Sequence, residues 1–154
     1  MEKRIEILID GSNIAFFIRD EKKKAKLSTL EILTIYLEKI KKIHFIEYQI
    51  ITDASLKYKI DDRNKLEEYY KYGKIIETPK GVQADDFIIE YAKRYPNTTI
   101  IISNDCFKEY DTTKLTIIKF GLIFSDVVLK PDLLTILNNL QLNYSKSEGK
   151  VESI

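Results

Sequence analysis

The sequence predicts an α/β fold, in which a single domain forms a three-layer sandwich around a mainly parallel central sheet. Strand-length apolar runs alternate along the chain with segments of helical spacing, which is typical of a doubly wound sheet. The runs are rich in isoleucine and nearly continuous, as expected of strands covered on both faces. They comprise residues Ile5 to Ile9, Tyr48 to Ile51, Lys74 to Ile76, Ile100 to Ile102 and Leu115 to Phe120.

The first two helices are predicted from apolar spacing and from residues that favour helix ends. Apolar residues recur at helical intervals over residues 29–43, and Ser28 with Glu31 matches a capping box at the start of that segment. Lysines near its end suit the negative end of a helix dipole. A second helix is predicted to begin at a cap formed by Asp61 or Asp62.

The later helices and the end of the domain are predicted in the same way. Gly73 is expected to end the second helix, and apolar spacing predicts a third helix over Ala84 to Tyr95. A fourth helix is expected after Pro131-Asp132. The last segment is rich in Ser, Lys and Glu, so we expect the folded domain to cover residues 1–142 and a flexible tail to cover residues 143–154.

Composition excludes several classes of protein. The 154 residues suit one domain, and 44% hydrophobic with 11% aromatic residues suits a globular chain. No apolar run approaches the roughly 20 residues of a membrane span, so we expect no membrane partner. The chain start lacks the layout of a signal or transit peptide, so we expect a cytoplasmic protein. One cysteine, Cys106, and one histidine, His44, rule out an internal disulfide and a four-ligand zinc site.

Acidic residues stand where two predicted strands end and where one predicted helix begins. Asp10 follows the first strand, and Asp105 follows the strand at residues 100–102. Because the carboxyl ends of parallel strands share one edge of the sheet, these two side chains are expected to converge. Asp85 and Asp86 open the third helix, where adjacent side chains point about 100° apart. We expect one of them to reach the site and the other to orient it or a bound water.

These four acids favour a metal centre. Close carboxylates repel one another unless a cation or a raised pKa compensates, and hard oxygen ligands suit Mg²⁺, with Mn²⁺ as an alternative. Glu109 lies one helical turn beyond Asp105 and is a further candidate, either to bind the metal through water or to stay solvated.

A purely structural interpretation stays open for each acid. Aspartate before glycine or asparagine commonly forms turns, and aspartate in the first turn of a helix is favoured by the helix dipole. Asp53, which follows the second strand, carries the same ambiguity. The expected convergence of several acids on one sheet edge favours the functional interpretation.

Three segments also carry a family resemblance. They are Ile7-Leu8-Ile9-Asp10-Gly11-Ser12-Asn13, Ala84-Asp85-Asp86-Phe87-Ile88-Ile89 and Ile101-Ile102-Ser103-Asn104-Asp105, with a weaker echo at Phe124-Ser125-Asp126. In this order they resemble the NYN branch of the PIN-like ribonucleases, closest to the Regnase type. The resemblance implies a Rossmann-like PIN/NYN fold and a Mg²⁺-dependent ribonuclease. It further implies that Asp10, Asp85, Asp86 and Asp105 surround the ion and that Asn13 supports the catalytic site.

Two positions depart from the family pattern. Glu109 stands where the family usually has aspartate, and Cys106 stands where a hydroxyl residue is common. No cysteine-rich zinc finger accompanies the domain, so a homodimer or a partner that selects the RNA is an alternative route to targeting.

The resemblance implies hydrolysis of RNA phosphodiester bonds, with products that carry 5′-phosphate and 3′-hydroxyl ends. Single-stranded or loop RNA is the expected substrate, because a site at a sheet edge must reach a backbone that is free to bend. Ser12, Ser103 and Asn104 are candidates to hydrogen-bond the carboxylates or the scissile phosphate, although each could satisfy local backbone groups instead. Lys80, in the loop before Asp85, is the first candidate for phosphate binding.

Other surface residues could contact RNA as well. Lys57, Lys59 and Arg63 form a basic region after the second strand, and Tyr58, Tyr69, Tyr70 and Tyr72 are candidates to stack on unpaired bases. Solvation of charges and packing of aromatic rings are the more common roles of such residues.

Several alternatives to a ribonuclease remain at this stage. The strongest is a noncatalytic RNA-binding or protein-interaction module on the same fold, since fold alone does not establish activity. A receiver-type phosphoacceptor domain would use an acid such as Asp53, and a phosphatase would need an acid where Ser12 stands. DNA cleavage is also open, because metal-assisted hydrolysis does not require a 2′-hydroxyl. Dependence of cleavage on metal and on Asp10 separates these classes.

Overall fold

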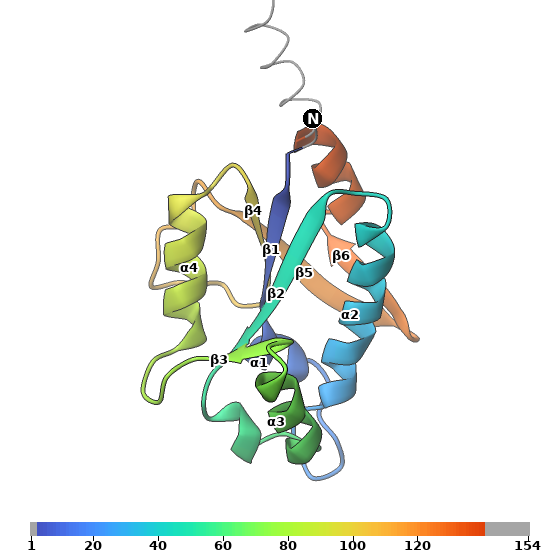
Figure 1. The fold of residues 1–154 in the computed structure, drawn as a ribbon, viewed down its shortest axis with the longest axis vertical. Helices are drawn as coiled ribbons and strands as arrows, with labels where there is room; N and C mark the ends of the chain where they lie inside the picture. The colour runs from blue at the N-terminus through green and yellow to red at the C-terminus, as the bar shows by residue number, and fades with distance from the viewer. Residues whose placement is uncertain (1–2, 141–154) are drawn as a thin grey trace, which may run out of the picture.

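A six-stranded sheet forms the centre of the computed structural model, which describes residues 3–140 (Figure 1). The strands are β1 (Ile5–Asp10), β2 (Ile46–Thr52), β3 (Ile75–Glu77), β4 (Thr99–Ile102), β5 (Thr116–Ile123) and β6 (Asp126–Lys130), in the spatial order β3-β2-β1-β4-β5-β6. All neighbours pair in parallel except β5 and β6, which form an antiparallel hairpin. The predicted α/β fold with a mainly parallel sheet is confirmed.

β1 occupies the middle of this sheet and sets the position of the site. It pairs with β2 on one side and with β4 on the other, so that Ile9 lies opposite both Ile50 and Ile102. The carboxyl ends of these three strands therefore share one edge. The winding of the chain reverses at β1, and in open α/β sheets such a switch point is where ligands bind.

Helices cover both faces of the sheet. α2 (Leu27–Lys41), α3 (Arg63–Lys71) and the helical residues 133–140 pack on one face, and α4 (Ala84–Arg94) packs on the other (Figure 1). The fourth helix predicted after Pro131-Asp132 is therefore present. Side chains of β1 alternate between the two layers, since Ile9 joins the α2 side and Leu8 the α4 side.

Two short helices were not predicted. α1 (Gly11–Ala15) follows β1 directly, and the 3₁₀ helix η1 (Leu56–Tyr58) follows β2. Both are too short to show helical periodicity in the sequence, and both lie at the carboxyl edge of the sheet.

The start of α2 corrects the predicted capping box. The helix begins at Leu27, before Ser28, and its first amide is capped from another element, because the Leu27 N–H donates to Asp61 Oδ1 at 3.0 Å. Glu31 instead faces α3, where its Oε2 lies 2.7 Å from Lys65 Nζ. A tertiary contact replaces the local cap, which sequence spacing cannot reveal.

The predicted boundaries of α3 are confirmed. Asp62 caps the helix, since its Oδ1 accepts the Lys65 N–H at 3.1 Å. Gly73 follows the last turn with a φ of +70°, the left-handed conformation that glycine adopts at low cost. Its N–H donates to the Tyr70 carbonyl at 3.1 Å, which ends the helix.

Strand β6 appeared in the sequence only as the weak echo at Phe124-Ser125-Asp126. Its three apolar residues lie between the charged residues Asp126 and Lys130, and this run was not predicted as a strand. Its pairing with β5 comes from the hairpin, in which Ile123 lies opposite Asp126. Charged residues on a short edge strand also discourage pairing with another chain.

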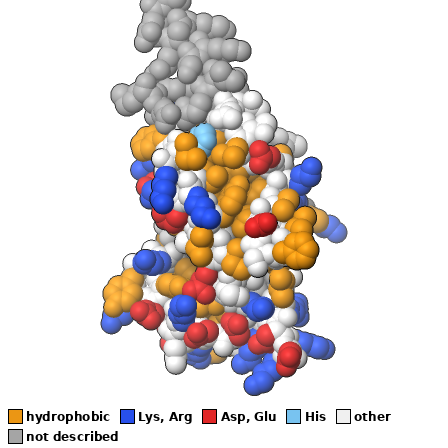
Figure 2. Space-filling model, turned by 90° about the vertical axis from the view of Figure 1, so that its right-hand side faces the viewer, with side chains coloured by type: hydrophobic (Ala, Val, Ile, Leu, Met, Phe, Trp, Pro, Cys, Tyr) orange, Lys and Arg blue, Asp and Glu red, His pale blue; other side chains and the backbone are white. Residues whose placement is uncertain are grey.

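Figure 2 shows acidic and basic side chains mixed at the lower end of the molecule, below a largely hydrophobic surface. This face does not carry a single sign of charge, in keeping with the net charge of +1. Within residues 3–140, no helix is long and apolar enough to cross a membrane. The domain end predicted at residue 142 and the tail predicted at residues 143–154 lie outside the described residues.

Candidate metal centre

Three of the four predicted acids converge at the carboxyl edge of the sheet. Asp10 ends β1, Asp85 lies in the first turn of α4, and Asp105 follows β4. Each offers a carboxylate oxygen, and these oxygens all lie within 4.8 Å of one another. The convergence follows from the alternation of β1, because Asp10 shares the α4 face of the sheet with Leu8.

Ser103 holds Asp10 in place. The Asp10 side chain is 3% exposed, and its Oδ2 accepts a hydrogen bond from Ser103 Oγ at 2.7 Å. The same Oγ accepts the Asp105 N–H at 3.1 Å. One buried hydroxyl therefore links two of the three acids.

Burial and mutual repulsion make the three acids unfavourable neighbours when all are ionised. Burial raises the pKa of Asp10 to about 7, and the charges of Asp85 and Asp105 add to the rise, while the Ser103 hydrogen bond opposes it. Burial also raises the pKa of Asp85 to about 6, with further contributions from the charges of Asp105 and Asp53. A divalent cation would relieve this repulsion, and the all-oxygen donor set suits a hard cation such as Mg²⁺.

The loop that carries Asp105 is fixed on both sides. Asp105 Oδ1 accepts the Phe107 N–H at 2.9 Å, and the buried Phe107 ring packs with Ile88 of α4. Phe107 has a φ of +48°, so the chain turns sharply after the acid. Lys119 of β5 donates from Nζ to the Asp105 carbonyl at 2.7 Å, a contact that the sequence did not predict.

Asp86 and Glu109 lie outside the group of three carboxylates. Asp86 points about 100° away from Asp85 around α4 and accepts a hydrogen bond from the Tyr110 hydroxyl. Glu109 is exposed and lines a cavity together with Asp85 and Asp105, but its carboxylate is not among the close oxygens. Direct ligation by Asp86, and ligation by Glu109, stay predictions.

The predicted polar residues each have a protein partner. Asn13 Oδ1 accepts the Asn104 N–H at 2.8 Å, which ties α1 to the end of β4. The Asn104 side chain makes two bonds to the backbone of Phe120, at 2.8 and 2.9 Å. Ser12 Oγ accepts the Asp53 N–H at 3.0 Å. These bonds support the site, and contact of Ser12, Ser103 or Asn104 with a substrate stays a prediction.

Asp53 has a structural role that the sequence left open. Its Oδ1 accepts the Ala84 N–H at 2.6 Å, so a residue following β2 caps α4 and positions Asp85. One oxygen of this carboxylate is therefore bonded to a backbone amide, and the receiver-type alternative, which would use Asp53 as phosphoacceptor, stays without a supporting observation.

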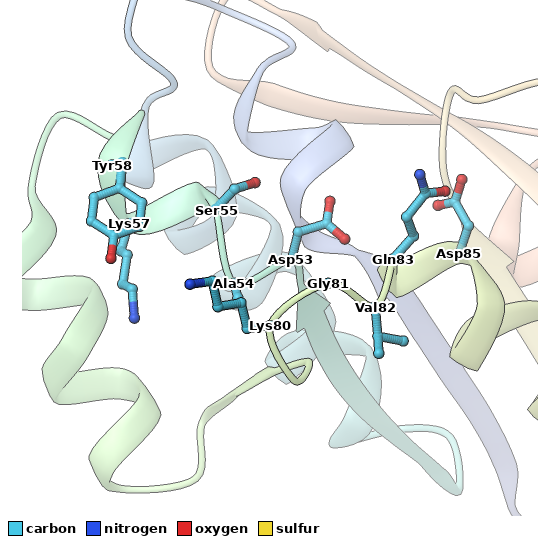
Figure 3. A pocket seen from close by; sticks show the side chains of 10 residues that line it. All are labelled: Asp53, Ala54, Ser55, Lys57, Tyr58, Lys80, Gly81, Val82, Gln83 and Asp85. Carbon is cyan, nitrogen blue, oxygen red and sulfur yellow. The ribbon is translucent and has the colours of Figure 1, made fainter.

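Lys80 does not touch the three acids. It is exposed and lines a groove that extends from Asp85 along the carboxyl ends of β2 and β3 (Figure 3). The predicted role of Lys80 in phosphate binding stays a prediction.

Comparison with known proteins identifies the family. The model of the family described as Zc3h12a-like ribonuclease NYN domain matches residues 3–123, well over half of the chain. The chain belongs to this family. The predicted resemblance to Regnase-type NYN ribonucleases is thereby confirmed. No curated protein matches the NYN chain in sequence.

Two solved structures of nuclear protein-only RNase P 2 (PRORP2) from Arabidopsis thaliana share the fold of this NYN domain. Their sequence identities are 17% and 18%, and their TM-scores are 0.59 and 0.62. Each similarity covers 81% of this chain but 29% of the plant chain. The NYN domain therefore spans less than a third of the length of these relatives, and at these identities the similarity concerns the fold.

Proposed function

We propose that this NYN domain is a Mg²⁺-dependent ribonuclease that cuts single-stranded or loop RNA internally and leaves 5′-phosphate and 3′-hydroxyl ends. Its membership of a ribonuclease family supports RNA as the substrate. The single observation that carries the metal dependence is the convergence of Asp10, Asp85 and Asp105 within 4.8 Å. Mn²⁺ is expected to replace Mg²⁺, because both ions favour oxygen ligands.

The charge balance of the site supports a cation. Within residues 3–140, no lysine or arginine forms an ion pair with any of the three carboxylates. A buried acid without a counter-charge destabilises a protein, so such a cluster is retained at functional sites rather than for stability.

The three acids differ in what they can do. Asp10 is buried and held by Ser103, so it would serve as a fixed ligand. Asp85 and Asp105 are partly exposed and face the cavity, where a phosphate and an attacking water would approach. A bound Mg²⁺ would supply activation of water and neutralisation of charge at the phosphate. Asn13 would act through Asn104, by holding the loop that leads to Asp105.

The deciding experiment is cleavage of a labelled single-stranded RNA by the wild type and by Asp10→Asn, each with Mg²⁺, Mn²⁺ or EDTA. We expect cleavage only by the wild type and only with metal, and end analysis should find 5′-phosphates. Cleavage that survives EDTA would refute the metal dependence. Binding without cleavage by folded wild type on several RNAs would instead favour the noncatalytic module, and a parallel DNA substrate tests the specificity for RNA.

A further inference from the structure

A groove of about 530 Å³ extends from the metal centre over the carboxyl ends of β2 and β3 (Figure 3). This volume lies within the range of roughly 300–1,000 Å³ that is common for ligand-binding clefts. Its lining comprises Asp53, Ala54, Ser55, Lys57, Tyr58, Lys80, Gly81, Val82, Gln83 and Asp85. The groove is open and is lined by charged and polar side chains together with apolar ones, Ala54 and Val82 among them.

Charge is arranged in order along the groove. Asp85 stands at one end, next to Asp10 and Asp105, whereas Tyr58 and Lys57 stand at the opposite end. Lys80 and then Asp53 lie between them (Figure 3). Lys80 is exposed and forms no ion pair within the described part of the chain, whereas Lys57 Nζ lies 3.5 Å from Glu77 Oε2. A polyanion that reaches the acids through this groove would therefore meet cations first.

Tyr58 is the exposed aromatic residue of the groove. It is 67% exposed. The guanidinium carbon of Arg63 lies 4.9 Å from the ring centroid and Lys57 Nζ lies 5.6 Å from it. Leu56, buried in the core, anchors η1, the short helix that carries Tyr58.

Other tyrosines predicted as stacking candidates have different roles. The Tyr69 hydroxyl donates to Glu31 at 2.6 Å, and the Tyr70 hydroxyl bonds to Thr52 at 2.5 Å, so both support the fold. Tyr72 resembles Tyr58 in exposure, at 66%, and in having a nearby cation, Lys71, at 5.9 Å from the ring centroid. Tyr72 does not line the groove, which makes it a matched control.

We propose that this groove binds the single-stranded segment of RNA next to the cleavage site. An unpaired base stacks on Tyr58, a phosphate lies on Lys80, and the chain continues to the carboxylate of Asp85. Stacking on an exposed ring needs a base that is free of its pairing partner, so the groove selects single strands over duplex. The assignment rests on the proposed ribonuclease function.

The first test measures binding without cleavage. An Asp10→Asn background in Mg²⁺ keeps RNA intact, and fluorescence anisotropy follows a labelled 12-nucleotide oligouridylate. We expect Tyr58→Ala to weaken binding by roughly 5- to 150-fold, the equivalent of one stacked base, while Tyr58→Phe retains affinity. Tyr72→Ala should bind as the background does. Lys80→Gln should reduce the slope of log affinity against log salt concentration by about one, which corresponds to one phosphate contact.

The second test separates this inference from the nuclease assignment. In the otherwise unmodified protein, kcat/KM for single-stranded RNA should fall in Tyr58→Ala and not in Tyr72→Ala. Equal binding and cleavage by these two variants would overturn the groove assignment and leave the ribonuclease standing. Equal affinity of the Asp10→Asn protein for a duplex of matched length would overturn it as well. If the wild type cleaves no RNA but its binding still depends on Tyr58, the ribonuclease assignment is refuted and the groove assignment is upheld.

Discussion

Ser103 and Asp10 are separated by 93 residues in the chain, yet their side chains form a buried hydrogen bond of 2.7 Å. The bond joins the ends of β1 and β4, which are neighbours in the sheet. It also lowers the pKa of Asp10, against the effect of burial. Ser103 therefore keeps a buried acid available as a ligand.

Ser103→Ala should weaken metal binding. Without the hydroxyl, the pKa of Asp10 rises further and Asp105 loses the acceptor for its N–H. We expect Mn²⁺ affinity at pH 7 to fall about tenfold, in the range typical for residues that orient ligands. Isothermal titration calorimetry measures the change, and Ser125→Ala, at the exposed β5–β6 turn, is the control. An affinity equal to that of the control would contradict the role of Ser103.

Asp10→Asn should stabilise the metal-free protein at high pH. The pKa of Asp10 is raised from 3.8 to about 7 by folding, so the folded state binds a proton that the unfolded state releases between these values. The stability contributed by Asp10 is complete below about pH 4 and is lost as the pH rises through 7. At pH 8 without metal, we expect the variant to be more stable by about 1–3 kcal/mol.

Urea unfolding in EDTA at pH 4 and pH 8 measures this difference. The extra stability of Asp10→Asn over the wild type should shrink toward zero at pH 4. Mg²⁺ should stabilise the wild type more than the variant, because a ligand that binds the folded state raises its stability. If the variant is less stable than the wild type at pH 8, the ionised Asp10 carboxylate does not destabilise the metal-free protein, and the prediction fails.

Gly11→Ala should destabilise the domain. A Cβ at Gly11 would lie 2.6 Å from Thr52 Cγ2 and 3.0 Å from the Ile51 carbonyl, so β2 would have to move away from α1. We expect a loss of about 1–3 kcal/mol in the free energy of unfolding. Gly121→Ala is the control, since its nearest contact would be the Val128 carbonyl at 3.9 Å. Equal thermal stability of both variants would argue against the close approach.

The cap of α2 provides a test of the fold. Asp61→Ala removes the acceptor of the Leu27 N–H and should cost about 1 kcal/mol in the free energy of unfolding. Ser28→Ala should change the free energy of unfolding by only about a few tenths of a kcal/mol, because Ser28 lies inside the helix and makes no cap. Denaturant titration compares the two, and a larger effect of Ser28→Ala would restore the capping box predicted from the sequence.

Local patterns in the sequence predicted the strands of the parallel sheet, the helices α2, α3 and α4, the helical residues 133–140, and the convergence of Asp10 with Asp105. The reason is geometric: buried parallel strands must be apolar, and their carboxyl ends share one edge. Asp10 and Asp105 could therefore be placed together without coordinates. The short helices α1 and η1 carry too few residues for such a pattern, and β6 is set by its hairpin pairing with β5.

Only the tertiary structure decided which side chains meet across elements. Asp85 and Asp86 are equivalent in the sequence, and the orientation of α4 on the sheet places the first with Asp10 and the second against Tyr110. Likewise, Asp61 and Asp53 cap helices remote from them in the chain. These contacts depend on the packing of whole elements, which periodicity along one segment does not encode.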